Sequence, residues 1–473
     1  MTATDKHIGI RNHPDVAGNI NLLEIWLQAR IAYEGLPGTA VGIVHDQDLV
    51  YAAGFGHADV ESKTQMTANS IFRIASHSKL FTAISVMQLR DAGKLQLDDP
   101  ITDYLPWFNI QNRHTSSRPV TIRHLLTHTS GLPREAGSGY WLDFDFPTME
   151  QVRERLPDQE TIFPTETRWK YSNLALALAG EIVAVISGQS FSDYVQANIF
   201  NPLEMASSSA EFPEEHRDRL VTPYTRRLPK RDREPLPFVD AVGLAAATGL
   251  SSTVTDMARF ISWQFRLLQS DDTEVLAANT LREMQRPHWV QPDWKSGWGI
   301  GFAIEHRDDR DLIGHGGGYP GNLTSTRISP KEKVGVIVFT NSADSAPAEI
   351  SDRIFEWIAP AIVRAAKGES GEQPDPAWAN YEGTYRNLWG DSHVLNLDDS
   401  LTMISPTLPN PKPDGLTLQP AGEHTFTMEG KGSGPLGEPV VFDLGPDGTA
   451  TRAKIGVGWS DRVSYPVPID RSV

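Results

Sequence analysis

The sequence predicts an α+β protein in which an antiparallel sheet carries helices on its faces and a helical insert, followed by a small all-β barrel. Strand-like segments stand at both ends of residues 1–366, and helical segments lie between them. Residues 367–377 have the Gly-, Glu- and Pro-rich composition of a linker. From residue 378 onward, Gly, Pro and Asp turns separate short strand-like segments without a helix. We therefore expect a first domain at 1–366 and a barrel domain at 378–473.

The expected sheet is built from two hairpins that lie far apart in the sequence. Residues 40–44 and 49–55 are rich in β-forming residues, and the polar residues between them predict a turn. Residues 323–328 and 334–341 form the second hairpin, and residues 298–302 also have strand character. The expected helices are 20–33, a helix from Ser76 that stops at Gly93, a short capped helix within 121–133, and 174–186, 257–268 and 350–363.

The expected barrel has about eight short strands. The clearest of them are residues 393–397, 401–405, 416–418, 425–428, 440–444 and 449–455.

Composition excludes several function classes. The chain has 473 residues and a formal net charge of -17 at pH 7, which argues against nucleic acid or an anionic membrane as its main partner. It has no cysteine, so disulfides, thiol catalysis and cysteine metal ligands are excluded. Residues 1–18 lack the apolar core of a signal peptide, and the most apolar long segment, 174–186, is too short to span a bilayer. We expect a cytoplasmic protein.

The segment that begins at Ser76 places a nucleophile beside a base. A three-residue step along a helix puts Ser76 and Lys79 on one face. Unpaired N–H groups at the helix start would stabilise negative charge on a reacting oxygen. The helix is apolar on nearly all faces, so Lys79 should be buried, with a lowered pKa, and would accept the proton of Ser76. The alternative is a capping serine followed by a surface lysine, since Ser-x-x-Lys also occurs by chance.

Two histidines, His124 and His128, stand four residues apart in the manner of metal ligands. The glutamate of a zinc-protease helix is missing between them, and no third ligand is apparent. We therefore expect histidines that are hydrogen-bonded inside the fold, and neither a metal nor a cofactor.

The loop at 134–150 carries several aromatic side chains, including Tyr140 and Trp141. Exposed aromatic rings are unfavourable, so the loop either packs over a neighbouring helix or forms one wall of a substrate cleft. In the second case, Asp143 and Asp145 would favour a ligand that bears an amine.

Two further segments hold polar side chains in fixed positions. Tyr171 lies on the loop that enters the buried helix at 174, where its phenol would face a pocket or point into water. Residues 313–321 contain His315 and many glycines, which let a sheet edge approach a substrate closely. Phosphate binding is the competing use of such glycines, but a P-loop lysine and dinucleotide spacing are missing.

Three motifs resemble those of a known family. Ser76-x-x-Lys79, Tyr171-Ser172-Asn173 and His315-Gly316-Gly317 are similar, in this order, to the active-site motifs of the class C β-lactamase and D-alanyl-D-alanine carboxypeptidase family of serine hydrolases. The resemblance implies the fold of β-lactamases and penicillin-binding proteins. Flanking sequence also resembles the family at 72–79, 124–133, 169–173 and 253–260, within an overall coverage of about 36–341, and residues 381–385 resemble the start of the lipocalin-like domain of some members.

The resemblance implies an acyl-enzyme mechanism. Ser76 would attack an ester or amide carbonyl, and Lys79 and Tyr171 would share the proton transfers. A Lys79 cation would favour a Tyr171 phenolate, so the two titrations should be coupled. The backbone N–H groups of Ser76 and Gly318 would form the oxyanion hole.

The resemblance also implies substrate-binding roles. Asn173 would orient the substrate or Lys79, His315 would line the opposite wall, and Gly317 and Gly318 would contact the substrate. Tyr140 and Trp141 are added as candidate substrate contacts if their loop forms a cleft wall.

Departures from the family pattern narrow the range of expected substrates. Many members have a lysine where this chain has His315, which is a weaker and mostly neutral anchor for a substrate carboxylate. Cell-wall peptides lie outside the cytoplasm, so the missing export signal points away from them too. The loops at 164–167 and 202–205 also differ from the family text, which leaves their shape open.

We therefore expect a serine hydrolase of esterase or (D-)aminopeptidase type that acts on small esters, amides or short peptides. β-Lactamase, carboxypeptidase-like and acyltransferase activities are the alternatives. A receptor without activity is a further alternative, against which the intact set of Ser76, Lys79, Tyr171 and His315 argues. Nucleic acid and membrane partners are not expected, and a homo-oligomer stays open.

Overall fold

The structure of the protein is a computed structural model, which describes residues 9–137, 139–210, 214–307, 310–369, 373–431 and 436–472. The described residues fall into two compact units. One comprises residues 38–351 and 470–473, and the other comprises 1–37 and 352–469. The segments before 38 and after 351 thus group with the barrel, whereas the sequence suggested one boundary near 366. Residues 370–372 of the expected linker lie outside the described part of the chain.

The first unit is built on an antiparallel sheet with the strand order β2-β1-β13-β12-β11-β10-β9-β8, and β3 pairs with β2. Strands β1 and β13 lie side by side, with Val41 opposite Val338, so the two expected hairpins form one continuous surface. Both strands are buried along nearly their whole length, because helices cover the sheet. The strands are β1 (Gly38–His45), β2 (Asp48–Asp59), β3 (Thr64–Gln65), β8 (Trp289–Val290), β9 (Ser296–Trp298), β10 (Ala303–His306), β11 (Asp311–Tyr319), β12 (Asn322–Ser329) and β13 (Val334–Thr340).

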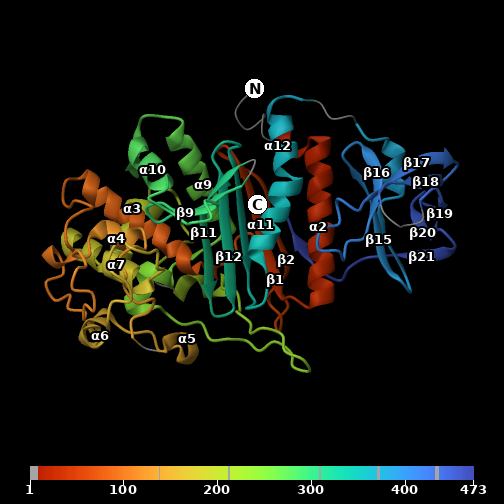
Figure 1. Ribbon diagram of the computed structural model, residues 1–473. Helices are drawn as coiled ribbons and strands as arrows, with labels where there is room; N and C mark the ends of the chain where they lie inside the picture. The colour runs from red at the N-terminus through yellow and green to blue at the C-terminus, as the bar shows by residue number, and fades with distance from the viewer. Residues whose placement is uncertain are drawn as a thin grey trace. The chain divides into compact units, whose positions relative to one another are not determined.

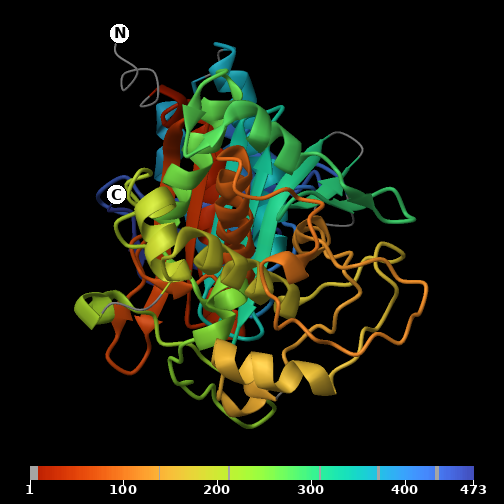
Figure 2. The same ribbon diagram turned by 90° about the vertical axis from the view of Figure 1, so that its left-hand side faces the viewer.

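Helices formed by the middle of the chain gather on one side of this sheet (Figure 1). Figure 2 looks onto that side and shows α3, in orange, over the sheet. These helices are α3 (Ser78–Asp91), α4 (Ile122–Leu126), α5 (Tyr140–Asp143), α6 (Met149–Arg155), α7 (Asn173–Ser187), α8 (Phe191–Val195), α9 (Val254–Leu268) and α10 (Ala278–Gln285). Two short strand pairs, β4 (Phe72–Arg73) with β5 (Ser251–Ser252) and β6 (Thr273–Glu274) with β7 (Leu276–Ala277), lie outside the main sheet.

Two expected elements differ from the structure. The single helix expected at 350–363 is two helices, α11 (Pro347–Trp357) and α12 (Ala359–Ala366), because Pro360 in the first turn of α12 cannot donate a hydrogen bond to a preceding turn. The strand expected at 298–302 ends at Trp298. Gly301 has a φ of +78° there, and its N–H donates to the carbonyl of Leu126 instead of to a neighbouring strand.

The second unit contains a closed barrel of eight antiparallel strands in sequence order. The first and last strands pair, with Thr384 opposite Val463, so the barrel has no open edge. Tyr385, Met428 and Val440 are among the fully buried side chains of its interior. The strands are β14 (Gly383–Asn387), β15 (Gly390–Leu397), β16 (Ser400–Ile404), β17 (Leu416–Gly422), β18 (Thr425–Glu429), β19 (Pro439–Leu444), β20 (Ala450–Ile455) and β21 (Gly458–Val463).

Helix α2 (Pro14–Glu34) belongs to the same unit as the barrel. Its Trp26 indole donates to the carbonyl of Leu408, and the Tyr33 hydroxyl donates to Asp391. A side chain at Gly18 would lie 2.6 Å from the backbone oxygen of Asn396, so glycine allows the helix to approach the barrel this closely.

The predicted fold class is confirmed: an antiparallel sheet with helices is accompanied by a separate closed barrel. The resemblance of the barrel to lipocalins stays a prediction.

Across the described ranges, no single helix is long and apolar enough to cross a membrane. Helix α7 and residues 191–200, bent by 79° relative to each other, meet the length and composition criteria only as a pair.

The position of α3 depends on aromatic packing around Phe81. This side chain is fully buried, and its ring lies 5.2 Å from that of Phe200 and 4.7 Å from that of Phe260. Replacing Phe81 with Ala should leave a cavity and cost about 3–5 kcal/mol of stability. Calorimetric melting of the purified protein should show a clearly lower transition temperature for the unit that contains α3. Val185→Ala, at a side chain that is 51% exposed on α7, is the control and should leave that transition nearly unchanged.

Candidate active site

Ser76 lies on a sharp turn that leads into α3. A short 3₁₀ turn covers Ala75–His77, and α3 begins two residues later than Ser76. Ala75 has a φ of +51°, a left-handed conformation that side chains rarely adopt and that turns the chain abruptly. Ser78 fixes the turn, because its hydroxyl donates to the carbonyl of Ala75 and accepts from the N–H of Leu250. Ser76 is half-buried while its neighbours on both sides are buried, so its hydroxyl faces the open side of the turn.

Lys79 is fully buried and its amine contacts three oxygens. It donates to the Asn173 side-chain oxygen over 2.8 Å and to the Ala247 carbonyl over 2.6 Å, and its Nζ lies 3.1 Å from Ser76 Oγ. The Asn173 and Ala247 oxygens can only accept hydrogen bonds. When the amine is neutral, its two hydrogens therefore go to these oxygens and its lone pair is left for the Ser76 hydroxyl.

The surroundings of Lys79 favour the neutral amine. Burial lowers its pKa well below 10.5, the nearby Arg134 lowers it further, and Glu135 acts in the opposite direction. A buried amine whose pKa is lowered in this way is a better general base near neutral pH for a serine at hydrogen-bond distance than an exposed lysine.

Tyr171 lies next to this pair. Its ring centre is 4.8 Å from Lys79 Nζ and 5.0 Å from the guanidinium carbon of Arg134. Burial raises the pKa of Tyr171, while a hydrogen bond with Ser76 and the charge of Arg134 lower it to a lesser extent. The phenolate expected from the sequence is thus disfavoured at rest, and the neutral phenol is suited to pass a proton to a leaving group.

A carboxylate that the sequence analysis did not select supports the site. The side-chain amide of Asn173 donates to both oxygens of Glu135, over 3.0 and 3.1 Å. This contact fixes the orientation of Asn173, because a carboxylate accepts only from the NH₂ end and leaves the oxygen end for Lys79. The Tyr140 hydroxyl and the Arg134 guanidinium also donate to Glu135.

The third motif lies on β11, beyond the part of this strand that pairs with β10. His315 is 7% exposed, and its ring centre is 6.0 Å from that of His77 and 6.4 Å from that of Tyr171. The structure therefore brings the third motif to the other two.

Gly317 allows β11 to lie against the Ser76 turn. A Cβ atom there would overlap the Thr324 hydroxyl and the carbonyl of Ile74. Gly318 has room for a Cβ, so its glycine is not required by packing in the described structure. The oxyanion hole that Ser76 and Gly318 were expected to form stays a prediction.

The two histidines that stand four residues apart, which the sequence predicts to be hydrogen-bonded inside the fold, have separate partners. His124 Nδ1 accepts from the N–H of Thr121 as part of a helix cap, and His128 Nδ1 accepts from the N–H of Ser172. Within the described ranges, no group of three His, Asp or Glu side chains is arranged to hold a metal ion.

The two aromatic candidates on the loop at 134–150 lie in different environments. Tyr140 is fully buried and supports Glu135 through its hydroxyl, so it offers no surface to a substrate. Trp141 is half-buried, with its ring 5.7 Å from Tyr319 at the end of β11. Asp143 and Asp145 are exposed, and the acidic group whose charge acts on the amine of Lys79 is Glu135.

Sequence reasoning missed Glu135, the Ala247 carbonyl and Trp298. Glu135 follows directly on the segment 124–133 that resembles the family, which was the only signal in the sequence for it. Trp298 closes the site beside His128 and His315, at ring distances of 4.8 and 5.4 Å. A backbone carbonyl such as that of Ala247 leaves no signal in the sequence, because every residue has one.

A serine at a strained helix start, a buried amine one turn further and a tyrosine across from both define a class: the serine hydrolases with the fold of penicillin-binding proteins. The chain belongs to the beta-lactamase family, whose model matches residues 24–360. The resemblance seen in the sequence is thus confirmed.

Individual relatives agree with this membership. The chain is 31% identical to Penicillin-binding protein 4 of Amycolatopsis lactamdurans, over 65% of this chain and 81% of that protein. It is 31% identical to Esterase EstB of Burkholderia gladioli, over 59% and 78%. For Beta-lactamase-like protein 2 of Dictyostelium discoideum, the identity is 27% over 72% of this chain, but the match spans only 62% of that relative's length.

A solved structure shares the fold over almost the whole chain. It is described as an octameric penicillin-binding protein homologue from Pyrococcus abyssi. The TM-score is 0.63 at 24% identity, and the match covers 93% of this chain and 99% of that one.

Glu135 should set the pH dependence of activity through Lys79. Its charge raises the pKa of Lys79, so Glu135→Gln should lower that pKa further. Only the neutral amine can accept the Ser76 proton, so the acid limb of the kcat/KM profile should move to lower pH. We expect kcat/KM at the optimum to fall about tenfold, because one charge-assisted hydrogen bond is weakened. Asp145→Asn, on the same loop, is the matched control, and an unmoved acid limb in Glu135→Gln would contradict this role.

Proposed function

We propose that this protein is a serine hydrolase that cleaves small esters or amides through an acyl-enzyme on Ser76, and that it is of esterase or (D-)aminopeptidase type. The observation that carries the proposal is the 3.1 Å contact between Ser76 Oγ and the buried amine of Lys79. Membership of the beta-lactamase family supports it, as does the relative named as an esterase.

In the acylation step, Lys79 accepts the proton of Ser76 as Oγ forms a bond to the substrate carbonyl carbon. The bond from this carbon to the leaving oxygen or nitrogen then breaks. Tyr171 delivers a proton to the leaving atom and recovers one from Lys79, so an alcohol or amine departs and the proton count is unchanged.

In the deacylation step, water replaces the alcohol or amine. The same two side chains remove a proton from the attacking water and return it to Ser76 Oγ, which releases a carboxylic acid. Glu135 and Asn173 keep the Lys79 amine in place through both steps, because Asn173 cannot rotate without losing its contacts with Glu135.

Penicillin-binding and β-lactamase activities form the second candidate function, supported by the relatives with those names. His315 weighs against them, because burial lowers its pKa well below 6.5. A neutral imidazole lacks the charge that would attract the carboxylate of a β-lactam or of a D-alanyl-D-alanine terminus.

Cellular location and assembly belong to the proposal as well. The proposed site of action is the cytoplasm. Assembly from several copies is compatible with the octameric description of the Pyrococcus abyssi homologue.

A hydrolysis screen tests the function. Purified protein is offered p-nitrophenyl esters, D- and L-amino-acid p-nitroanilides and a chromogenic cephalosporin. We expect turnover of esters or anilides to exceed that of the cephalosporin, and Ser76→Ala to lose activity by a factor of at least about 10³, because the nucleophile is removed.

Ser187→Ala, at a half-buried serine at the end of α7, is the control and should keep full activity. A serine-directed phosphonate should label the unmodified protein and fail to label Ser76→Ala. Equal labelling of both proteins, or equal turnover, would refute the acyl-enzyme on Ser76.

A further inference from the structure

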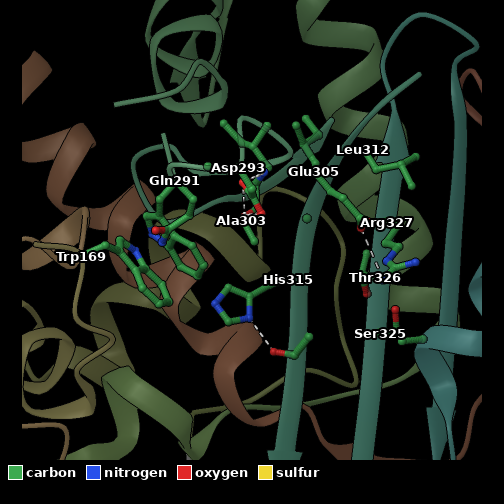
Figure 3. A pocket seen from close by; sticks show the side chains of 18 of the residues that line it. Trp169, Gln291, Asp293, Ala303, Glu305, Leu312, His315, Ser325, Thr326 and Arg327 are labelled. Atoms are coloured by element: carbon green, nitrogen blue, oxygen red, sulfur yellow. Dashed lines mark hydrogen bonds and ion pairs between the residues drawn. The ribbon is translucent and has the colours of Figure 1, made fainter. Parts of the chain in front are cut away.

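A cavity of about 730 Å³ adjoins the site where β11 is no longer paired with β10. This volume is in the usual range for small-molecule pockets. Figure 3 shows Trp169 and His315 toward one end of the cavity and Leu312 and Arg327 toward the other. Gly314 and Gly316 are also part of the lining, and a Cβ at Gly314 would overlap the carbonyl of Thr326 on the neighbouring strand.

The walls are mainly apolar. Trp169, Trp298, Ala303, Ile304, Leu312 and Ile313 are among the lining residues. An aryl or alkyl group that enters would therefore be removed from water, with a gain of about 25 cal/mol per Å² of apolar surface.

The charged groups of the lining have partners within the protein. Glu305 forms ion pairs with Arg307 at 2.8 Å and with Arg327 at 3.5 Å. Asp293 accepts from the N–H groups of Lys295 and Ser296 in its own turn. Arg327 is the only arginine or lysine of this lining, so a ligand carboxylate would have to compete with Glu305 for it.

His315 offers such a carboxylate no donor. Its Nδ1 contacts the carbonyl of Gly316, which can only accept, so Nδ1 carries the proton and donates it there (Figure 3). In the neutral ring, Nε2 then presents a lone pair, and no group of the described residues donates to it. Burial keeps the pKa of His315 well below 6.5.

Three residues that line the cavity surround the ring of Tyr171. The cavity walls at Trp169, Trp298 and His315 contact this ring, at centre distances of 6.1, 6.0 and 6.4 Å. Under the proposed function, Tyr171 protonates the leaving oxygen or nitrogen. The group attached to that atom must therefore lie next to Tyr171, and these three lining residues are neighbours of its ring.

We propose that this cavity binds the leaving group of the substrate, and that it selects an uncharged, largely apolar alcohol or amine over one that bears a carboxylate. This preference specifies the leaving group of the reaction described under the proposed function, and it rests on that function. It makes the enzyme a hydrolase for esters or amides of neutral alcohols and amines, in contrast to a carboxypeptidase, whose leaving group is an amino acid with a free carboxylate.

The first test varies only the charge of the leaving group. 4-Acetoxybenzamide and 4-acetoxybenzoate release phenols of nearly equal shape, and their rates are normalised to hydroxide-catalysed hydrolysis. We expect kcat/KM to be at least about tenfold higher for the neutral ester, because the carboxylate enters an apolar site without a free cation. His315→Lys should reduce this ratio at least about fivefold by supplying a cation. His306→Lys, at an exposed histidine that is not part of the lining, should leave the ratio unchanged.

The second test fills the cavity. Ala303→Phe should lower kcat/KM for 2-naphthyl acetate about tenfold and leave that for ethyl acetate within about twofold, because only the larger leaving group reaches the filled space. Ala206→Phe, at an exposed alanine outside the lining, is the matched control and should leave both substrates unaffected.

A binding measurement separates this inference from the proposed function. Ser76→Ala protein is titrated calorimetrically with the products 4-hydroxybenzamide and 4-hydroxybenzoate, and the neutral product should bind at least about tenfold more tightly. Equal affinities, or tighter binding of the carboxylate, would overturn the inference whatever the kinetics show. If no ester is hydrolysed but the neutral product still binds selectively, the proposed function fails, while the preference of the cavity for an uncharged ligand stands.

Discussion

The structure of the site depends on the burial of one amine. Lys79 has no exposed surface, and an unpaired charge there would be costly. The protein meets this constraint with fixed acceptors, the side chain of Asn173 and the carbonyl of Ala247, and with a carboxylate one contact further away. The amine can therefore change its protonation state without any movement of its neighbours, which is the condition for rapid proton exchange with Ser76.

The acceptors come from parts of the chain that only the fold brings together. Asn173 is the first residue of α7, and Ala247 lies in the short π-helical segment Ala245–Gly249. That segment also provides the carbonyls that accept from Thr82 and Arg73. It thus anchors both α3 and the strand that precedes it, and the geometry at Ser76 depends on a segment that lies far from Ser76 in the sequence.

Burial also determines the charge of the groups around His315, on the side of the site proposed to bind substrate. Burial keeps His315 neutral, and the ion pair of Glu305 with Arg327 leaves the adjacent cavity without an available cation. A lysine at this position would instead present a positive charge to the substrate. The choice of histidine or lysine at position 315 of β11 therefore changes the charge that the site offers to a substrate. It does so without altering the arrangement of Ser76, Lys79 and Tyr171.

The sequence by itself determined the fold class, most of the strands and helices, and the three motifs, because hydrophobic periodicity and side-chain spacing are local properties. It did not determine the break in the helix at Pro360, the end of β9 at Trp298, or the grouping of α2 with the barrel. Only the tertiary structure decided that Tyr140 supports Glu135, that Glu135 orients Asn173, and that Tyr171 rests as a neutral phenol. These properties depend on burial and on contacts between distant residues, and no local pattern in the sequence encodes either.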